Sequence, residues 1–235
     1  MAGLTTGGPN VDVSLLYDIN GLARHAPDRL DRVVGFVGEY GLPLAMVLLV
    51  LWCWHGARRQ DEAGAVDSFA ALVWAPLGAA LALLVNVPLR EFVARPRPFR
   101  KHDGLEVLAS GKTDFSFVSD HATLTMALGV GLFIANRRFG LVGIGLALLE
   151  GLCRVYMGVH YPTDVIGGLA LGTAVVLLLA PAAMAVLTPM VRALARSPRA
   201  GRLVRSRSLR LPRPVGLPQA PTPPGALPRE NDLAA

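Results

Sequence analysis

The sequence predicts an all-α integral membrane protein, a bundle of five to six membrane helices with an N-terminal helix at the membrane interface. Of its 235 residues, 52% are hydrophobic and only 17% are charged, a composition that excludes an ordinary soluble enzyme and an intrinsically disordered chain. Five stretches are apolar enough to approach the roughly 20 residues that cross a bilayer. Their basic flanks fall on one side of the predicted membrane.

The first expected element is a short helix over residues 13–22. Its apolar residues recur at roughly helical spacing, with Asp18 and Asn20 among them. The segment is too short to cross a hydrocarbon core of about 30 Å, so we expect it to lie in the interface. A sixth crossing by this helix stays open, and it would move the N-terminus inside without changing the orientation of the other five.

Five membrane helices are predicted after it, over residues 34–54, 65–89, 121–135, 139–152 and 163–186. The third and fourth are short and must borrow flanking residues to span a bilayer. From Arg192 the composition changes to arginine, serine and proline, with eight prolines between Pro198 and Pro228. We therefore expect two units: a membrane-embedded domain over residues 1–190 and a disordered basic tail over residues 191–235.

Positive charge predicts the orientation, because Lys and Arg collect in cytoplasmic loops. Arginine pairs stand at 58–59 and 137–138, and nine arginines follow the fifth span. Five crossings put all three groups on one side, which makes the tail cytoplasmic and the N-terminus external. The connections 90–120 and 153–162 then lie on the external face of the plasma membrane.

The net charge of +6 raises nucleic-acid binding as an alternative. The charge is concentrated in the tail, so a cytoplasmic anchor is the better interpretation and no nucleic-acid partner is expected. Anionic inner-leaflet lipids are the partners that fit such a tail, at about 1 kcal/mol per basic residue. A topology signal with no partner is the alternative. Two cysteines, Cys53 and Cys153, are too few for a zinc cluster or a disulfide framework.

The first polar group, Arg90-Glu-Phe-Val-Ala-Arg95-Pro96-Arg97-Pro98, closes the second span. Residues seven apart return to nearly the same face of a helix with about 3.6 residues per turn, so we expect Arg90 and Arg97 to point into one pocket. Guanidinium groups bind phosphate oxygens. These arginines could instead merely flank a span, but their external location runs against the usual bias.

The second group, Ser119-Asp120-His121, opens the third span. Ser119 is a good N-cap residue, and the free backbone N–H groups of a helix start bind anions. His121 at this position can donate a proton to a leaving oxygen. Asp120 would repel a phosphate unless it were protonated, paired or turned away. A plain helix cap with an interfacial histidine is the alternative.

The third group contains Arg154, His160 and Asp164 and leads into the fifth span. Asp164 in the first helical turn is close enough to hold one imidazole nitrogen of His160 and to leave the other free as a nucleophile. The alternative is a helix-start acid beside an interfacial histidine. Glu150, four residues before Arg154, is expected to pair with that arginine and position it.

In chain order the groups read R-x6-R-P, S-D-H and R-x5-H-x3-D. This pattern resembles the type 2 phosphatidic acid phosphatase superfamily, whose motifs are K-x6-R-P, P-S-G-H and S-R-x5-H-x3-D. Within that superfamily the chain is most similar to the bacterial undecaprenyl-diphosphatases of the bacitracin-resistance type, over most of residues 12–180. It departs from the motifs at Arg90 for Lys, Val118 for Pro, Asp120 for Gly and Cys153 for Ser.

The resemblance implies a membrane hydrolase that needs no metal or cofactor and acts on a polyprenyl or other lipid phosphate. It implies catalytic roles for His160, His121 and Asp164, with a phosphohistidine intermediate. Phosphate binding would fall to Arg90, Arg97, Ser119, Asp120 and Arg154. The implied reaction converts undecaprenyl diphosphate to undecaprenyl phosphate, which recycles the lipid carrier of cell-wall synthesis. Alternatives are a phosphatase for phosphatidic acid, phosphatidylglycerol phosphate or another prenyl phosphate, and a non-catalytic lipid-phosphate binder or flippase.

Overall fold

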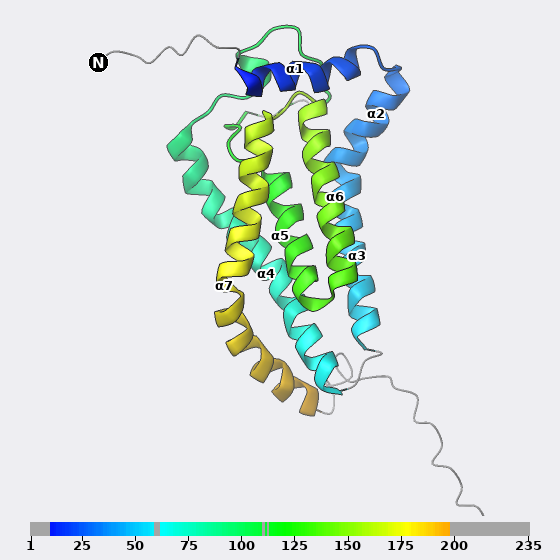
Figure 1. Cartoon of the computed structure of the whole chain (residues 1–235), viewed down its shortest axis with the longest axis vertical. Coiled ribbons are helices and arrows are strands. Elements are labelled where there is room, and N and C mark those ends of the chain that lie inside the picture. Colours follow the sequence, from blue (N-terminus) through cyan, green and yellow to red (C-terminus); the bar gives the residue numbers. More distant parts are fainter. Residues whose placement is uncertain (1–9, 59–61, 110, 112, 198–235) are drawn as a thin grey trace, which may run out of the picture.

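A computed structural model describes residues 10–58, 62–109, 111 and 113–197. Every regular element within these residues is helical, which agrees with the all-α prediction. In chain order the elements are α1 (Val11–Arg24), α2 (Asp28–Phe36), η1 (Val37–Gly41), α3 (Leu42–Ala57), α4 (Glu62–Val93), η2 (Pro98–Arg100), α5 (Asp120–Ala135), α6 (Arg137–Tyr156) and α7 (Pro162–Arg196). Figure 1 shows them as an elongated bundle with α1 across one end.

The membrane-spanning prediction agrees with the length and polarity of these helices. Four helical segments of the described chain are long and apolar enough to cross a bilayer: Asp28–Ala57, Gly64–Arg100, Arg137–Tyr156 and Pro162–Arg196. The first combines α2, η1 and α3 into one continuous rod. The remaining predicted span is α5, a shorter apolar helix of 16 residues. The chain is therefore a multi-pass membrane protein.

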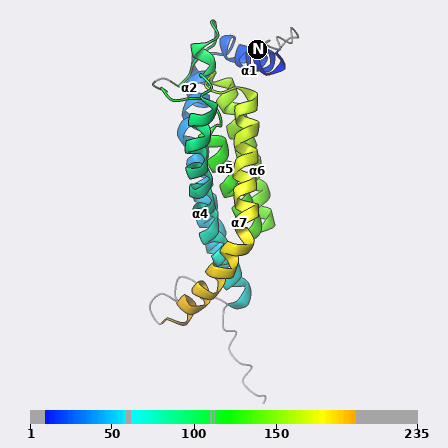
Figure 2. The same cartoon turned by 90° about the vertical axis from the view of Figure 1, so that its left-hand side faces the viewer.

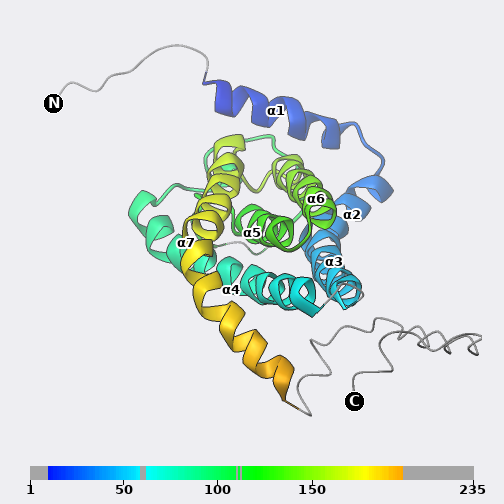
Figure 3. The ribbon, with the colours of Figure 1, turned by 60° about the horizontal axis from the view of Figure 1, so that its bottom comes forward.

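Helix α1 lies across the end of the bundle instead of running along it (Figures 1 and 3). Leu16 is fully buried beneath it, packed with Val155, Tyr161 and Val165. Asn20 is also buried and donates to the carbonyl oxygens of Glu106 and Tyr156, at 2.8 and 2.7 Å. This position agrees with the predicted interfacial helix and not with a sixth crossing.

Helix α5 is the central helix of the bundle, surrounded by α4, α6 and α7 (Figure 3). Most of its residues are buried, so protein and not lipid surrounds it, which explains why it is shorter than a lipid-facing span. Small residues allow its neighbours to approach closely. A Cβ atom at Gly129 would lie 2.9 Å from the carbonyl carbon of Gly143 in α6, and one at Gly172 in α7 would lie 2.5 Å from the carbonyl oxygen of Thr123.

Helix α7 continues to Arg196, beyond the predicted domain boundary at residue 190. Figure 2 shows its C-terminal part bending away from the axis of the bundle. Pro181 and Pro189 lie inside the helix, where each removes a backbone donor and favours a bend. Val191 and Ala195 then pack on Val66 and Ala70 of α4. The rest of the predicted tail, residues 198–235, lies outside the described residues.

Candidate active site

A pocket at the α1 end of the bundle brings together side chains from all three predicted groups. Its volume is about 290 Å³. The residues that line it are Arg97, Gly111, Thr113, Asp114, Asp120, His121 and His160. We call it the phosphate pocket, because cationic and imidazole groups meet there.

The ring of His160 is held in one orientation by the backbone of a distant segment. Its Nδ1 atom lies 2.9 Å from the carbonyl oxygen of Ser116. A carbonyl oxygen only accepts hydrogen bonds, so Nδ1 must carry the proton. Nε2 is then unprotonated, and it accepts a hydrogen bond from Nη1 of Arg97 at 3.2 Å. The unprotonated nitrogen of His160 is therefore held beside a guanidinium group.

Asp164 is close to His160 but is not its nearest acceptor. Its Oδ2 atom lies 3.6 Å from Nδ1 of His160, which is longer than a hydrogen bond. The backbone N–H of Tyr161 donates to the same oxygen at 2.9 Å, and Arg95 donates to the other oxygen at 2.7 Å. Asp164 was predicted to hold one imidazole nitrogen; it lies near Nδ1, but the Ser116 carbonyl oxygen makes the direct hydrogen bond.

Burial keeps His160 in its neutral form. Removal from water lowers the pKa of His160, Asp164 raises it, and the positive charges of Arg97 and Arg154 lower it again, with a net lowering from the ordinary value. Because the ordinary pKa of histidine is about 6.5, a histidine whose pKa is lowered further is unprotonated at neutral pH. An imidazole with a free lone pair is the form that can act as a nucleophile.

Arg90 and Arg97 lie close together, but not on one helix face, and of the two only Arg97 lines the phosphate pocket. Helix α4 ends at Val93, Ala94 takes a left-handed φ of 47°, and Arg97 is extended with ψ of 151°. The two guanidinium groups meet at Asp114 instead, whose carboxylate oxygens lie 2.8 Å from each. The predicted continuous helix through Arg97 is therefore wrong, because Pro96 and Pro98 favour extended backbone.

Asp114 is a site residue that the sequence did not reveal. Burial raises the pKa of its carboxyl group, but the hydrogen bond and charge of Arg97 and the charge of Arg90 outweigh this and lower the pKa overall. Asp114 is therefore a carboxylate at neutral pH. It stands among the arginines where a phosphate would bind.

The start of α5 has the predicted cap. Ser119 is its N-cap residue, is fully buried, and accepts from the backbone N–H of Ala122 at 3.5 Å. Asp120 is paired, as its charge requires. It forms an ion pair with Arg90 and accepts from the side-chain amide of Asn86 at 2.7 Å. His121 lines the pocket, with Nε2 4.0 Å from Oε1 of Glu39.

Arg154 is fully buried behind the pocket and points toward η1. It donates to the carbonyl oxygen of Gly38 and to Oε2 of Glu39, both at 2.9 Å. Glu150 lies 3.5 Å away, which agrees with the predicted pair. Glu39 is a second residue that the sequence did not reveal, and it links Arg154 to His121. Its only signal is a lone acidic residue inside the apolar stretch 34–54.

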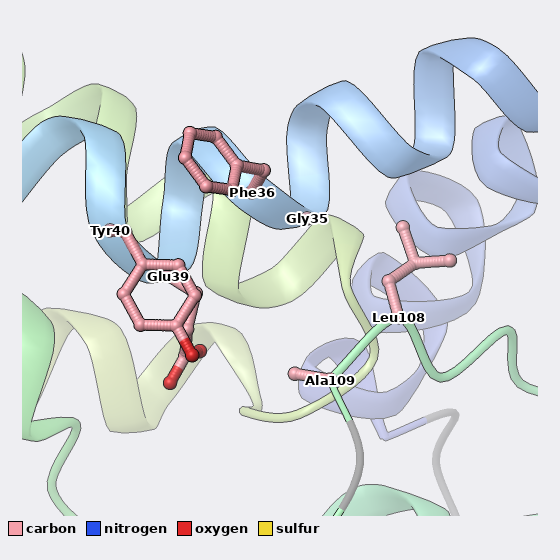
Figure 4. Close-up of a pocket in the computed structure, with 6 residues that line it drawn as sticks. All are labelled: Gly35, Phe36, Glu39, Tyr40, Leu108 and Ala109. Carbon is pink, nitrogen blue, oxygen red and sulfur yellow. The ribbon is translucent and has the colours of Figure 1, made fainter.

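A second pocket of about 280 Å³ opens beside Glu39. Figure 4 shows its lining residues, Gly35, Phe36, Glu39, Tyr40, Leu108 and Ala109. Phe36 and Tyr40 at its edge are largely exposed, and Glu39 lies 4.0 Å from His121 of the phosphate pocket. Among the described residues, no three His, Cys, Asp or Glu side chains are grouped as metal ligands.

Comparisons with known proteins show what the chain is similar to. Residues 71–187 match the family model described as the PAP2 superfamily. The chain is 30% identical over 152 residues to undecaprenyl-diphosphatase BcrC of Bacillus subtilis (strain 168), covering 64% of this chain and 73% of the relative. It is 27% identical over 164 residues to the putative undecaprenyl-diphosphatase YbjG of Escherichia coli (strain K12), covering 69% and 78%.

A solved structure shares the fold. It is the crystal structure of a transmembrane PAP2 type phosphatidylglycerolphosphate phosphatase from Bacillus subtilis. The match has a TM-score of 0.53 and 22% sequence identity, and it covers 75% of this chain and 88% of the other.

Proposed function

The chain belongs to the PAP2 superfamily and is a membrane phosphatase, and from that premise we propose that it hydrolyses undecaprenyl diphosphate to undecaprenyl phosphate and inorganic phosphate. The observation that carries the proposal is the phosphate pocket, where the unprotonated nitrogen of buried His160 lies 3.2 Å from Arg97. Two relatives at 30% and 27% identity are named as undecaprenyl-diphosphatases, one of them putatively, and this supports the choice of substrate.

The first chemical step is attack by Nε2 of His160 on the terminal phosphorus. An N–P bond forms while the bond from phosphorus to the bridging oxygen breaks, and His121 gives its proton to that leaving oxygen. The product still in the site is a phosphohistidine, whose positive ring is stabilised by the Ser116 carbonyl and by Asp164. Undecaprenyl phosphate leaves.

The second step returns the enzyme to its starting state. His121, now neutral, takes a proton from a water molecule as the oxygen of that water attacks phosphorus. The N–P bond breaks, phosphate leaves, and His160 recovers its lone pair. The same two histidines therefore act in both steps.

We assign phosphate binding to Arg90 and Arg97, the two arginines that form ion pairs with Asp114 in this structure. Arg97 and Arg90 contact the equatorial oxygens, where charge is largest in the transition state. Asp120 fixes Arg90 through their ion pair. Arg154 and Ser119 are fully buried and are not among the residues that line the pocket. We assign them a role in stabilising the residues that do.

The prenyl chain of the substrate lies against the second pocket, where Phe36, Tyr40 and Leu108 present apolar surface (Figure 4). We assign the active site to the outer face of the membrane, and the product is the lipid carrier that is recycled for cell-wall synthesis. The support for this orientation is the location of Arg58, Arg137 and Arg138 at the opposite end of the bundle from α1 (Figure 1).

The test is phosphate release by the purified protein in detergent with EDTA present. Undecaprenyl diphosphate is compared with phosphatidic acid and phosphatidylglycerol phosphate, for the wild type and for His160→Ala. We expect release mainly from the diphosphate, its loss in the variant, and an acid-labile phosphoprotein in the wild type alone. Wild-type release by a folded His160→Ala protein would reject the mechanism, and release mainly from a glycerolipid would reject the substrate.

A further inference from the structure

An ion-pair chain runs from the N-terminal helix to the residue that faces His160. It consists of Asp12 in α1, Arg95 in the segment after α4, and Asp164 in the first turn of α7. Arg95 donates through Nη2 to Oδ2 of Asp12 at 2.5 Å and through Nη1 to Oδ1 of Asp164 at 2.7 Å. One guanidinium group therefore bridges two carboxylates from helices that lie at opposite ends of the sequence.

Thr163 and Tyr161 complete this bridge. The backbone N–H of Thr163 donates to Oδ1 of Asp12 at 2.9 Å, and its hydroxyl donates to Oδ2 at 2.7 Å. The same hydroxyl accepts from Nη1 of Arg95 at 2.7 Å. The guanidinium carbon of Arg95 lies 3.7 Å from the centre of the Tyr161 ring, a cation–π contact. Arg95 is thereby fixed from three sides.

The two oxygens of Asp164 have separate partners, and this determines where the carboxylate points. Oδ1 is taken by Arg95, whereas Oδ2 accepts from Tyr161 N–H and faces His160. Asp164 is completely buried, and a buried carboxylate without a compensating charge is strongly disfavoured. Arg95 supplies that charge on the side away from His160.

We propose that Arg95 and Asp12 are positioning residues of the active site, which hold Asp164 in the orientation that faces His160. Helix α1 is then part of the catalytic apparatus and not only an interfacial anchor. This inference rests on the proposed function, because it assigns a purpose to Asp164 in the chemistry of His160. Neither Arg95 nor Asp12 is one of the charged residues or histidines that define the three motifs.

The location of these residues separates their effect from substrate binding. Among the described residues that line the phosphate pocket, neither Arg95 nor Asp12 occurs. Their loss should lower kcat and leave KM nearly unchanged. Helix α1 also keeps independent attachments through Leu16 and Asn20, so loss of the Asp12 carboxylate need not release it.

The pH profile offers a further readout. The titratable and charged groups around the His160–Asp164 pair come from every neighbouring element: Arg95 and Arg97 after α4, Asp114 before α5, Asp120 and His121 in α5, Arg154 in α6, and Asp12 in α1 through Arg95. Without Arg95 the negative charge of Asp164 acts on His160 uncompensated, and this favours the protonated form of His160. Because neutral His160 is the reactive form, the acid limb of the rate profile moves to higher pH.

The experiment measures kcat, KM and the pH profile on undecaprenyl diphosphate in detergent. The variants are Arg95→Ala, Arg95→Lys and Asp12→Ala, with Asp18→Ala as the matched control because Asp18 is an exposed acid on the same helix. We expect kcat to fall by about tenfold to a hundredfold in Arg95→Ala, the range typical when a partner that orients a functional histidine is lost. Asp12→Ala should lose less.

Arg95→Lys should restore the acid limb but only part of kcat, because an ammonium group does not reproduce the planar fork of a guanidinium. Asp18→Ala should match the wild type. The inference is overturned if folded Arg95→Ala and Asp12→Ala keep the wild-type kcat and acid limb while His160→Ala is inactive. An inactive wild type, or an active His160→Ala, would instead reject the proposed function itself.

Discussion

Asp114 places a carboxylate between the two arginines that we propose bind the phosphate of the substrate. It contacts Nε and Nη2 of Arg97 at 3.1 and 2.8 Å and Nη1 of Arg90 at 2.8 Å. Two arginines around one acidic group form the same arrangement that they would form around a phosphate. An incoming substrate must therefore displace the carboxylate before both guanidinium groups can reach its oxygens.

Removing this charge should strengthen the binding of phosphate analogues. In the wild type, orthovanadate must break the hydrogen bonds between Asp114 and the arginines, and a hydrogen bond to a charged group contributes roughly 1.5–3 kcal/mol. Asp114→Asn weakens these bonds, so we expect the Kd of orthovanadate to fall by at least about tenfold. Titration calorimetry on the purified protein measures this. Asp103→Asn, an exposed acid in the same connection, should bind like the wild type. Weaker binding by Asp114→Asn would mean that the carboxylate organises the arginines instead of competing for them.

The motif residues were predictable because spacing along the chain carries their signal. Arg97, His121 and His160 belong to three separate motifs, and they line one pocket. The partners that orient them carry no such signal. The Ser116 carbonyl that holds His160 is a backbone atom, and any residue type supplies one. Glu39 and Asp114 are single acids whose roles depend on contacts with distant elements, which spacing alone does not reveal.

At the scale of helices, the position of His121 relative to Asp164 depends on how closely α5 and α7 approach. A Cβ at Gly172 of α7 would lie 2.5 Å from the Thr123 carbonyl oxygen and 3.0 Å from the Ala127 backbone nitrogen. Both of those atoms belong to backbone, so neither can rotate away. Gly172 therefore sets the spacing between two helices that carry active-site residues at their starts.

Gly172→Ala should destabilise the protein and reduce its activity. We expect a loss of about 1–3 kcal/mol, the range for overpacking a tight core, visible as a lower Tm in detergent. Gly145→Ala is the matched control, because Gly145 lies on α6 with no atom within 4 Å of its added Cβ. That variant should be neutral or gain up to about 1 kcal/mol from helix propensity. Equal Tm values for the two variants would show that the α5–α7 contact tolerates a methyl group.

Helix existence was predictable from apolar length, whereas helix ends were set by tertiary contacts. The five apolar stretches all became helices, and one of the two short ones, 121–135, became the central helix α5. The second span was predicted to end at residue 89, and α4 ends at Val93, where a left-handed Ala94 and two prolines follow. At the other end of the bundle, α7 passes residue 190 because Val191 and Ala195 find apolar partners on α4.

For the whole molecule, the distribution of charge along the bundle axis predicts its orientation in the membrane. The C-terminal end of α3 and the N-terminal end of α6 lie opposite α1 (Figure 1). Arg58 directly follows α3, and Arg137 and Arg138 begin α6, so that end should be cytoplasmic. Lys101 and Arg138 are exposed at opposite ends of the molecule. In intact spheroplasts, a membrane-impermeant maleimide should label Lys101→Cys at once and Arg138→Cys only after permeabilisation. The unsubstituted chain is the control, since Cys53 and Cys153 are both buried. Immediate labelling of Arg138→Cys and protection of Lys101→Cys would invert the topology and move the phosphatase reaction to the cytoplasmic face.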